Sequence, residues 1–331
     1  MRRNNVHSSR YSRVQNIVIF KNPCDSLYNY YMSKYQNTVI VIAGPTASGK
    51  TALAIKLAQH LNTVIISADS RQCFRELNIG VAKPSVEELN TVKHYFISSH
   101  SIHDKVTAQV FEEYAVNITN EIFKQNRFIV MAGGTGLYIK AFCEGLDLIP
   151  EVDASIRKKV SNEYAAYGMQ WLQEQVQQHD YKFWQIAEQQ NPRRLMRALE
   201  VKLSTGRSIL QFRKGTQKVR SFNIIKFGID ISKDELYNNI DTRTNNMINA
   251  GLVEEVSSLF SYRNINALQT VGYKEIFEYM GGHDSLNLTI EKIKRNTRQY
   301  AKRQLTWFKK DQHIKWVNPD KFSLNFDEHL R

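Results

Sequence analysis

The chain has few cysteines for its length: Cys24, Cys73 and Cys143 are the only three among 331 residues. An odd number at such wide spacing excludes a disulfide framework, and the absence of any C-x-x-C pair removes a common zinc-binding signature. A chain of this length can bury a large core without either device. We therefore expect a protein of the reducing cytoplasm that is held together by its hydrophobic core.

Long apolar runs are also absent. The strongest, residues 39–43, has the length of a β-strand, whereas a membrane helix needs about 20 apolar residues. Hydrophobic residues make up 42% of the chain and charged residues 23%, which is globular composition and excludes a disordered or collagen-like chain. At about 150 residues per domain, the length favours two domains. No membrane partner is expected.

Acidic residues are outnumbered by basic ones: 32 Asp and Glu against 45 Lys and Arg give a formal net charge of +13. Such a charge is typical of proteins with a polyanionic partner, most often nucleic acid. A basic surface that is merely solvated is the alternative. In residues 291–310, Arg295, Lys302 and Lys309 recur every seven residues beside an apolar stripe. This spacing predicts an amphipathic helix with a basic face.

The first 36 residues differ from the rest of the chain. They contain no glycine, a single acid (Asp25) and little helical periodicity. We expect residues 1–36 to be an N-terminal extension that is disordered or not native to the folded protein. Met32, which comes shortly before the first predicted strand, is the alternative start.

From residue 37 onward, apolar strands alternate with amphipathic helices. Strands are predicted at 38–43, 63–68 and 128–132, and helices at 51–61 and 107–125. This order predicts a parallel, doubly wound α/β sheet.

Residues 152–215 interrupt this pattern, because they contain helical segments and no convincing strand. Within them, Asn191 and Pro192 form a helix start. We therefore expect an all-helical insertion at 152–215 in an α/β core made of residues 37–151 and 216–331. In the second part of the core we predict a strand at 221–230 and helices at 232–250, where Ser232 and Glu235 form a capping box, and at 252–260, 272–280 and 285–310.

The sharpest motif is a phosphate-binding loop between the first strand and the first helix. It matches G-x-x-x-x-G-K-[ST] at every fixed position. The backbone N–H groups of such a loop and the following helix N-terminus bind phosphate oxygens. We expect Lys50 to reach the outer phosphates and the Thr51 hydroxyl to bind Mg²⁺. The predicted diphosphate-binding residues are Gly44, Pro45, Thr46, Ala47, Ser48, Gly49, Lys50 and Thr51.

An acid follows the second predicted strand, at Asp69. Parallel sheets bind ligands at the carboxyl ends of their strands, so Asp69 and the phosphate loop are expected to line one crevice. The third strand ends in Gly133, Gly134 and Thr135, without an acid. The alternative for Asp69 is a simple turn cap.

Arg243 is a further candidate. Leu236, Ile240 and Met247 form an apolar stripe on the predicted helix 232–250, and Arg243 lies within that stripe. A buried arginine requires an anionic partner. That partner is either a ligand diphosphate or a carboxylate of the chain itself.

Several motifs together resemble one family. In order they are GPTASGKTALAI, ISADS, IGVAKP, GGTGLYIKA, RRLMRALEV, TVGYKE and AKRQLTWFK. The combination is similar to the tRNA dimethylallyltransferases, also called tRNA isopentenyltransferases, from about residue 39 to 317. The eukaryotic-type C-terminal zinc finger has no counterpart, so the resemblance is to the bacterial type.

The resemblance implies a reaction, a fold and a set of partners. The family transfers a dimethylallyl group from dimethylallyl diphosphate to N6 of the adenosine immediately 3′ of the anticodon in tRNA. The implied fold is a P-loop, nucleotide-kinase-like parallel sheet with a helical insertion, and the implied cofactor is Mg²⁺. The expected partners are the tRNA anticodon stem-loop and dimethylallyl diphosphate, and the expected state is a monomer.

The resemblance also implies residue roles. Asp69 matches the acid that accepts a proton from the target amine, and Arg243 matches an arginine that contacts the diphosphate. With Thr46 and Lys50 they form the expected catalytic set. The expected tRNA-binding residues are Asp69, Ser70, Arg71, Gln72, Thr135, Arg157, Arg193, Arg194, Leu195, Met196, Arg197, Lys302 and Arg303.

Two other functions use some of the same residues. A small-molecule or nucleotide kinase would use the phosphate loop and Asp69. A tRNA-binding protein without activity would use the basic surfaces alone. The +13 charge and the basic C-terminal segment favour prenyl transfer over a kinase, and the intact phosphate loop, Asp69 and Arg243 argue against an inactive protein.

Overall fold

The computed structural model describes residues 36–215 and 217–324. The predicted N-terminal extension lies outside these residues, apart from Gln36. Within the described part, a six-stranded sheet has the order β3-β2-β4-β1-β5-β6, and every neighbouring pair is parallel. The strands are β1 (Thr38–Ala43), β2 (Ile65–Ser67), β3 (His94–Tyr95), β4 (Phe128–Gly133), β5 (Asn223–Ile229) and β6 (Ile314–Val317).

Strand β1 is central, between β4 and β5, and its side chains alternate between the two faces of the sheet. Ile40 and Ile42 pack with Leu57 of α2 (Lys50–His60) on one face. On the other face, Val39 and Val41 belong to a larger core with helices α4 (Ala108–Ile122) and α5 (Gly136–Glu144). The β1 strand is fully buried because helices cover both faces, which is typical of parallel sheets.

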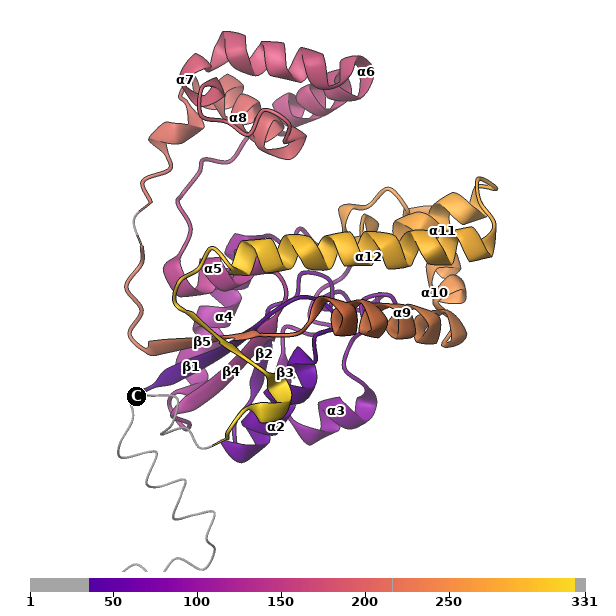
Figure 1. Cartoon of the computed structure of the whole chain (residues 1–331). Helices are drawn as coiled ribbons and strands as arrows, with labels where there is room; N and C mark the ends of the chain where they lie inside the picture. Colours follow the sequence, from indigo (N-terminus) through magenta and orange to yellow (C-terminus); the bar gives the residue numbers. More distant parts are fainter. Residues whose placement is uncertain (1–35, 216, 325–331) are drawn as a thin grey trace, which may run out of the picture.

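The C-terminal helices lie over the edge of the sheet at which the phosphate loop begins. Helix α12 crosses above this edge, with α9 beside it (Figure 1). The two helices pack through Leu236, Ile240 and Ala301, and Ala47 of the phosphate loop packs against this cluster. The C-terminal helices are α9 (Lys233–Asn249), α10 (Leu252–Ser258), α11 (Tyr273–Met280) and α12 (Leu286–Phe308). Helix α3 (Val86–Thr91) lies between β2 and β3.

The helical segment between α5 and β5 stands apart from the sheet on two extended connections (Figure 1). Its elements are α6 (Ala154–His179), α7 (Tyr181–Trp184), α8 (Pro192–Thr205) and the 3₁₀ turn η1 (Ile209–Gln211). Leu172, Val176 and Leu195 belong to a separate hydrophobic core. The predicted boundaries at 152 and 215 stay a prediction.

The fold class predicted from the sequence is confirmed, and most elements lie where they were expected. The Asn191 side chain caps α8 by accepting from Arg194 N, and Pro192 is the first helical residue. The capping box expected at Ser232 is only half present among the described contacts, since Ser232 Oγ accepts from Glu235 N without a return bond from the glutamate. A complete box forms at Ser85 and Glu88.

Helix α3, helix α5 and strands β3 and β6 were not predicted. Strand β3 has only two residues, and α5 follows glycines without a side-chain cap, so both lack local signals. In the described residues, no helix is both long and apolar enough to span a membrane.

Candidate functional site

The phosphate loop connects β1 to α2 and is closed by its own contacts. Ser48 Oγ donates to Pro45 O at 2.8 Å, and Lys50 Nζ donates to the same carbonyl at 2.5 Å. Gly49 precedes α2 with φ 83°, a left-handed conformation that favours glycine. The loop thus presents the N-terminus of α2 toward the edge of the sheet.

The carboxyl ends of β2 and β4 approach each other closely beside this loop. A Cβ placed on Gly133 would lie 2.2 Å from Ala68 O, so only glycine allows this approach. Immediately beyond, Ser70 N donates to Thr135 Oγ1 at 3.0 Å. The two turns are therefore joined next to Asp69.

Asp69 both caps a turn and lines the cavity, the two possibilities that the sequence left open. Its Oδ1 accepts from Arg71 N at 2.8 Å and from Gln72 N at 3.3 Å, so the carboxylate caps the turn after β2. It also lines the cavity that contains the phosphate loop. One carboxylate oxygen is thus held by the backbone, which fixes the orientation of the group.

A cavity of about 480 Å³ lies at this edge of the sheet. Thr46, Lys50, Thr51, Asp69 and Arg243 give it a polar end. Its apolar wall contains Val81, Ile240, Met247, Leu252, Val271 and Ile293.

Lys50 and Arg243, the two cations at the polar end, have no carboxylate partner within 4.0 Å among the described ion pairs. Arg243 Nη1 donates instead to Thr46 Oγ1 at 3.1 Å. Burial and, to a smaller extent, the nearby Arg243 lower the pKa of Lys50 to about 7, while Asp69 opposes the shift. Burial also lowers the pKa of Arg243. The alternative expected for Arg243, an ion pair with a carboxylate of the chain, is not observed among the described residues, and the polar end is suited to an anion.

The donors available to a divalent cation are few. The described residues contain no group of three or more His, Cys, Asp or Glu side chains that could hold a metal. Thr51 and Asp69 line the same cavity. A hydroxyl and a carboxylate fit Mg²⁺, which commonly takes its remaining ligands from phosphates and water.

The segment after β2 contributes residues that were predicted to bind tRNA. Ser70, Arg71 and Gln72 all line the cavity. However, Arg71 Nη1 donates to the carbonyls of Asn266 and Ala267. Gln72 Nε2 donates to Val81 O and Ala82 O. Gln72 therefore also holds a wall of the cavity, and Arg71 fixes the turn at Asn266 and Ala267.

At the arginine-rich start of α8, the helix turns some side chains toward solvent and others toward the core of the insertion. Arg193 is exposed and lines the cavity, while the exposed Arg194 pairs with Glu188 at 2.8 Å. Leu195 is 0% exposed and belongs to the core of the insertion. Its predicted tRNA contact is wrong for the side chain, because the helix turns it inward. Met196 is partly buried against the same core.

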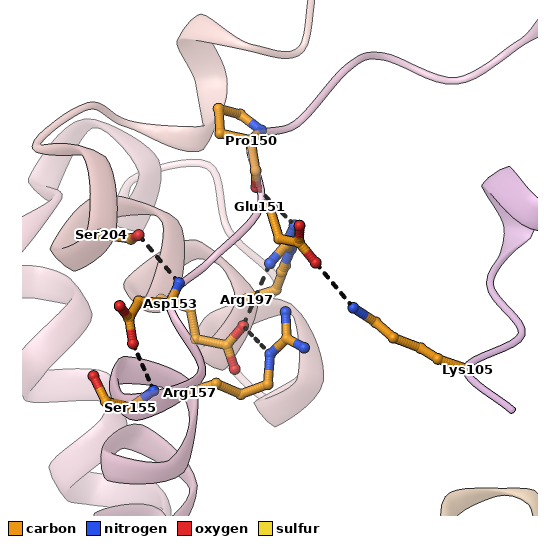
Figure 2. Close-up of polar contacts among 9 residues, drawn as sticks. Lys105, Pro150, Glu151, Asp153, Ser155, Arg157, Arg197 and Ser204 are labelled. Carbon is orange, nitrogen blue, oxygen red and sulfur yellow. Dashed lines mark hydrogen bonds and ion pairs between the residues drawn. The ribbon is translucent and has the colours of Figure 1, made fainter. Parts of the chain in front are cut away.

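Arg157 and Arg197 lie away from the cavity and share one carboxylate. Glu200 Oε2 is 3.7 Å from Arg157 Nε and 3.5 Å from Arg197 Nη1. Figure 2 shows these arginines beside the connection into the insertion, where Arg197 Nη2 also donates to Pro150 O. Lys105 reaches Glu151 from the core at 3.2 Å. The structure gives Arg197 a structural role and does not bring Arg157 to the phosphate loop.

The basic face predicted for α12 is present. Arg295, Lys302 and Lys309 are exposed, while Ile293 and Phe308 are buried. Arg303 is exposed and lines the cavity. The face therefore extends to the mouth of the site.

Two features of the site were missed from the sequence. Gln304 is buried, although it follows the exposed Lys302 and Arg303, and it contacts the phosphate loop. Glu255 accepts from Ile79 N at 2.7 Å and from Gly80 N at 3.0 Å, and thereby holds a cavity wall. Gln304 lies within the motif AKRQLTWFK, whereas Glu255 lies in none of the motifs.

Comparison with known proteins agrees with this geometry. The family model described as IPP transferase matches residues 72–311. A tRNA dimethylallyltransferase 2 of Azobacteroides pseudotrichonymphae is 44% identical over 88% of this chain and 94% of its own, and a tRNA dimethylallyltransferase of Cytophaga hutchinsonii is 42% identical over 87% and 94%. None of these relatives favours the kinase alternative.

Solved structures show the same relationship. The full-length tRNA isopentenylpyrophosphate transferase of Bacillus halodurans has a TM-score of 0.64 and 32% identity, and the match covers 89% of this chain and 93% of that one. A eukaryotic dimethylallyltransferase acting on tRNA has a TM-score of 0.72 at 23% identity, which shows the shared fold. With a family model that spans most of the described chain and relatives above 40% identity, the chain belongs to the IPP transferase family.

Proposed function

We propose that this protein transfers a dimethylallyl group from dimethylallyl diphosphate to N6 of the adenosine immediately 3′ of the anticodon in tRNA. The observation that carries the proposal is a single cavity with a cationic phosphate end, a carboxylate and an apolar wall. The relatives at 42–44% identity are named tRNA dimethylallyltransferases. We further propose that it acts as a monomer in the cytoplasm.

The diphosphate is assigned to the phosphate loop. Lys50, the loop amides and Arg243 would stabilise the negative charge that develops on the leaving group. Neither cation has a carboxylate partner among the described ion pairs, and burial lowers the pKa of both. A bound anion would favour the charged form that burial disfavours, which supports this assignment. Mg²⁺, held by Thr51 and substrate oxygens, would neutralise part of the diphosphate charge.

The new bond forms between N6 of adenine and the primary allylic carbon. The nitrogen lone pair attacks this carbon, the carbon–oxygen bond breaks, and the diphosphate leaves with the bonding electrons. The proton lost from N6 passes to the Asp69 carboxylate. The turn amides of Arg71 and Gln72 hold Oδ1, which keeps the carboxylate oriented toward the cavity.

The apolar wall suits the hydrocarbon part of the donor. Val81, Leu252 and Val271 come from three separate segments of the chain and line the same cavity as Asp69. Burying a hydrocarbon chain there stabilises its bound state by about 0.8 kcal/mol per CH₂. This burial also excludes water, which would otherwise compete with the amine for the allylic carbon.

The tRNA is assigned to the basic mouth of the cavity. Arg193 and Arg303 are exposed and line the cavity, and Lys302 is exposed next to Arg303 on α12. A loop base that leaves its stack can enter such a pocket at a cost of a few kcal/mol. Single-stranded loop bases are the easier targets for this form of recognition.

The test is a prenylation assay with labelled dimethylallyl diphosphate, Mg²⁺ and unmodified anticodon stem-loop RNA. The wild type is expected to label the RNA, and Asp69→Asn to slow the single-turnover rate by roughly 10²–10⁴-fold. Asp320→Asn, at an exposed position, is the matched control. No label with wild type would overturn the proposed function, and equal rates for Asp69→Asn would remove the base assignment alone.

A further inference from the structure

Gln304 is a buried polar residue on a helix whose neighbouring positions face solvent. Its exposed fraction is 7%, whereas Lys302 and Arg303 beside it are exposed. A buried amide side chain is stable only if both of its ends are hydrogen-bonded. Both ends of Gln304 find partners, and both partners belong to the site.

The two ends of the amide connect two separate loops. Gln304 Oε1 accepts from Thr46 N in the phosphate loop at 2.8 Å. Gln304 Nε2 donates to Gly134 O, in the turn after β4, at 2.9 Å. A Cβ on Gly134 would lie 2.2 Å from Gln304 Nε2, so the glycine leaves room for this contact.

The turn that receives Gln304 continues directly to the proposed base. Thr135 follows Gly134, and its Oγ1 accepts from Ser70 N, the residue next to Asp69. An unbroken path of hydrogen bonds and adjacent residues therefore runs from Thr46 through Gln304, Gly134, Thr135 and Ser70 to Asp69.

We propose that Gln304 is a positioning residue that fixes the distance between the phosphate loop and the base. This inference rests on the proposed function. The amine, the allylic carbon and the leaving group must be aligned between Asp69 and the loop, and a shift of about 1 Å can cost 10²-fold in rate. Gln304 touches neither reacting atom and acts through Thr46 and Gly134.

Its loss would release both loops at once. Without the amide, Thr46 N and Gly134 O lose their partners in a buried place, and each must relax or bind water. The phosphate loop and the base-bearing turn would then move independently. The chemical step would be affected more than the binding of RNA, because the exposed face of α12 is unchanged.

The experiment compares Gln304→Met with Gln299→Met in the prenylation assay, because Gln299 is exposed on the same helix. For Gln304→Met we expect a higher KM for dimethylallyl diphosphate, a lower kcat and a kcat/KM reduced by roughly 10²-fold, with unchanged RNA affinity. Gln299→Met is expected to match wild type. If Gln304→Met keeps wild-type kcat and KM while wild type labels RNA, the inference is wrong. A wild type that labels no RNA would instead contradict the proposed function.

Gln304→Glu separates a specific hydrogen bond from general packing. Its ionised carboxylate can still accept from Thr46 N but repels Gly134 O, whereas the protonated form can donate to that carbonyl. We therefore expect the activity of Gln304→Glu, relative to wild type at each pH, to rise as the pH falls. A ratio independent of pH would contradict the proposed contact to Gly134 and favour packing alone.

Discussion

Arg243 Nη1 donates to Thr46 Oγ1 at 3.1 Å, which places the guanidinium of α9 against the phosphate loop. Because Arg243 has no carboxylate partner in the described ion pairs, its charge is available to the leaving group. Arg243→Met is expected to reduce kcat/KM for dimethylallyl diphosphate by roughly 10²–10³-fold, as does loss of one stabilising donor at a developing anion. Steady-state assays at saturating RNA measure the effect.

Arg243→Lys serves as the comparison, since it keeps a charge without the planar guanidinium. It should retain more activity than Arg243→Met. Equal losses of kcat/KM in the two variants would show that the positive charge alone does not account for the role of Arg243.

The charge of Lys50 is expected to make anion binding depend on pH. Burial lowers its pKa to about 7, so the free enzyme carries the charged form below this pH and loses it above. Pyrophosphate favours the charged form, and binding at pH 8 should therefore take up a proton. Calorimetry in buffers of different ionisation enthalpy measures this uptake. Lys50→Arg, which stays charged, should lack it, and identical proton uptake in both proteins would contradict the assignment.

The same shift affects stability. Between about pH 7 and pH 10.5 the unfolded state holds a proton on Lys50 that the folded state lacks, so this residue makes the free energy of unfolding increase with pH across that window. Below pH 7 both states are protonated and the slope vanishes. Urea unfolding at several pH values should show a steeper rise of the free energy of unfolding with pH for wild type than for Lys50→Met. The same pH dependence in both proteins would contradict the contribution of Lys50.

Tyr273 is expected to stabilise the wall of the cavity through Glu255. The Tyr273 hydroxyl donates to Glu255 Oε1 at 2.5 Å, and the same carboxylate holds Ile79 N and Gly80 N. Tyr273→Phe should lower the free energy of unfolding by about 1.5–3 kcal/mol, the range for a bond to a charged group. Denaturant titration checks this value. Tyr262→Phe, at an exposed tyrosine, should change stability little; equal effects would contradict the role of Glu255.

The central part of the site could be predicted because each of its members has a local signal. The phosphate loop is a continuous motif, and Asp69 follows a strand whose carboxyl end must lie near that loop. Arg243 was visible as a charge within an apolar stripe. In each case helix period or strand order was sufficient to place the residue.

Gln304 and Leu195 show what local signals cannot supply. The partners of Gln304 lie 258 and 170 residues away in the chain, and no periodicity connects them. Leu195 was grouped with its basic neighbours by motif, but the period of α8 places it in the core of the insertion. The same helix geometry gives Arg193 and Arg197 different surroundings. Arg197 lies three residues before the buried Glu200 and pairs with it.

The difference between the exposed Arg193 and the paired Arg197 leads to a prediction on RNA binding. Arg193 and Arg303 are exposed at the cavity mouth, Lys302 is exposed next to Arg303, and all three should contact phosphates. Alanine at any one of them should weaken RNA binding and reduce the slope of log K against log salt concentration by about 1, measured by fluorescence anisotropy. Lys124→Ala, at an exposed pair with Glu121 on α4, should leave the slope unchanged.

Arg197→Ala is expected to behave differently from these variants. It leaves Glu200, which is 9% exposed, with a weakened set of partners, and should therefore lower the melting temperature. Because Arg197 is already engaged by Glu200 and by Pro150 O, the salt slope of RNA binding should stay close to that of wild type. A slope reduced by about 1 at unchanged stability would show that Arg197 binds phosphate and that the pair with Glu200 is broken on RNA binding.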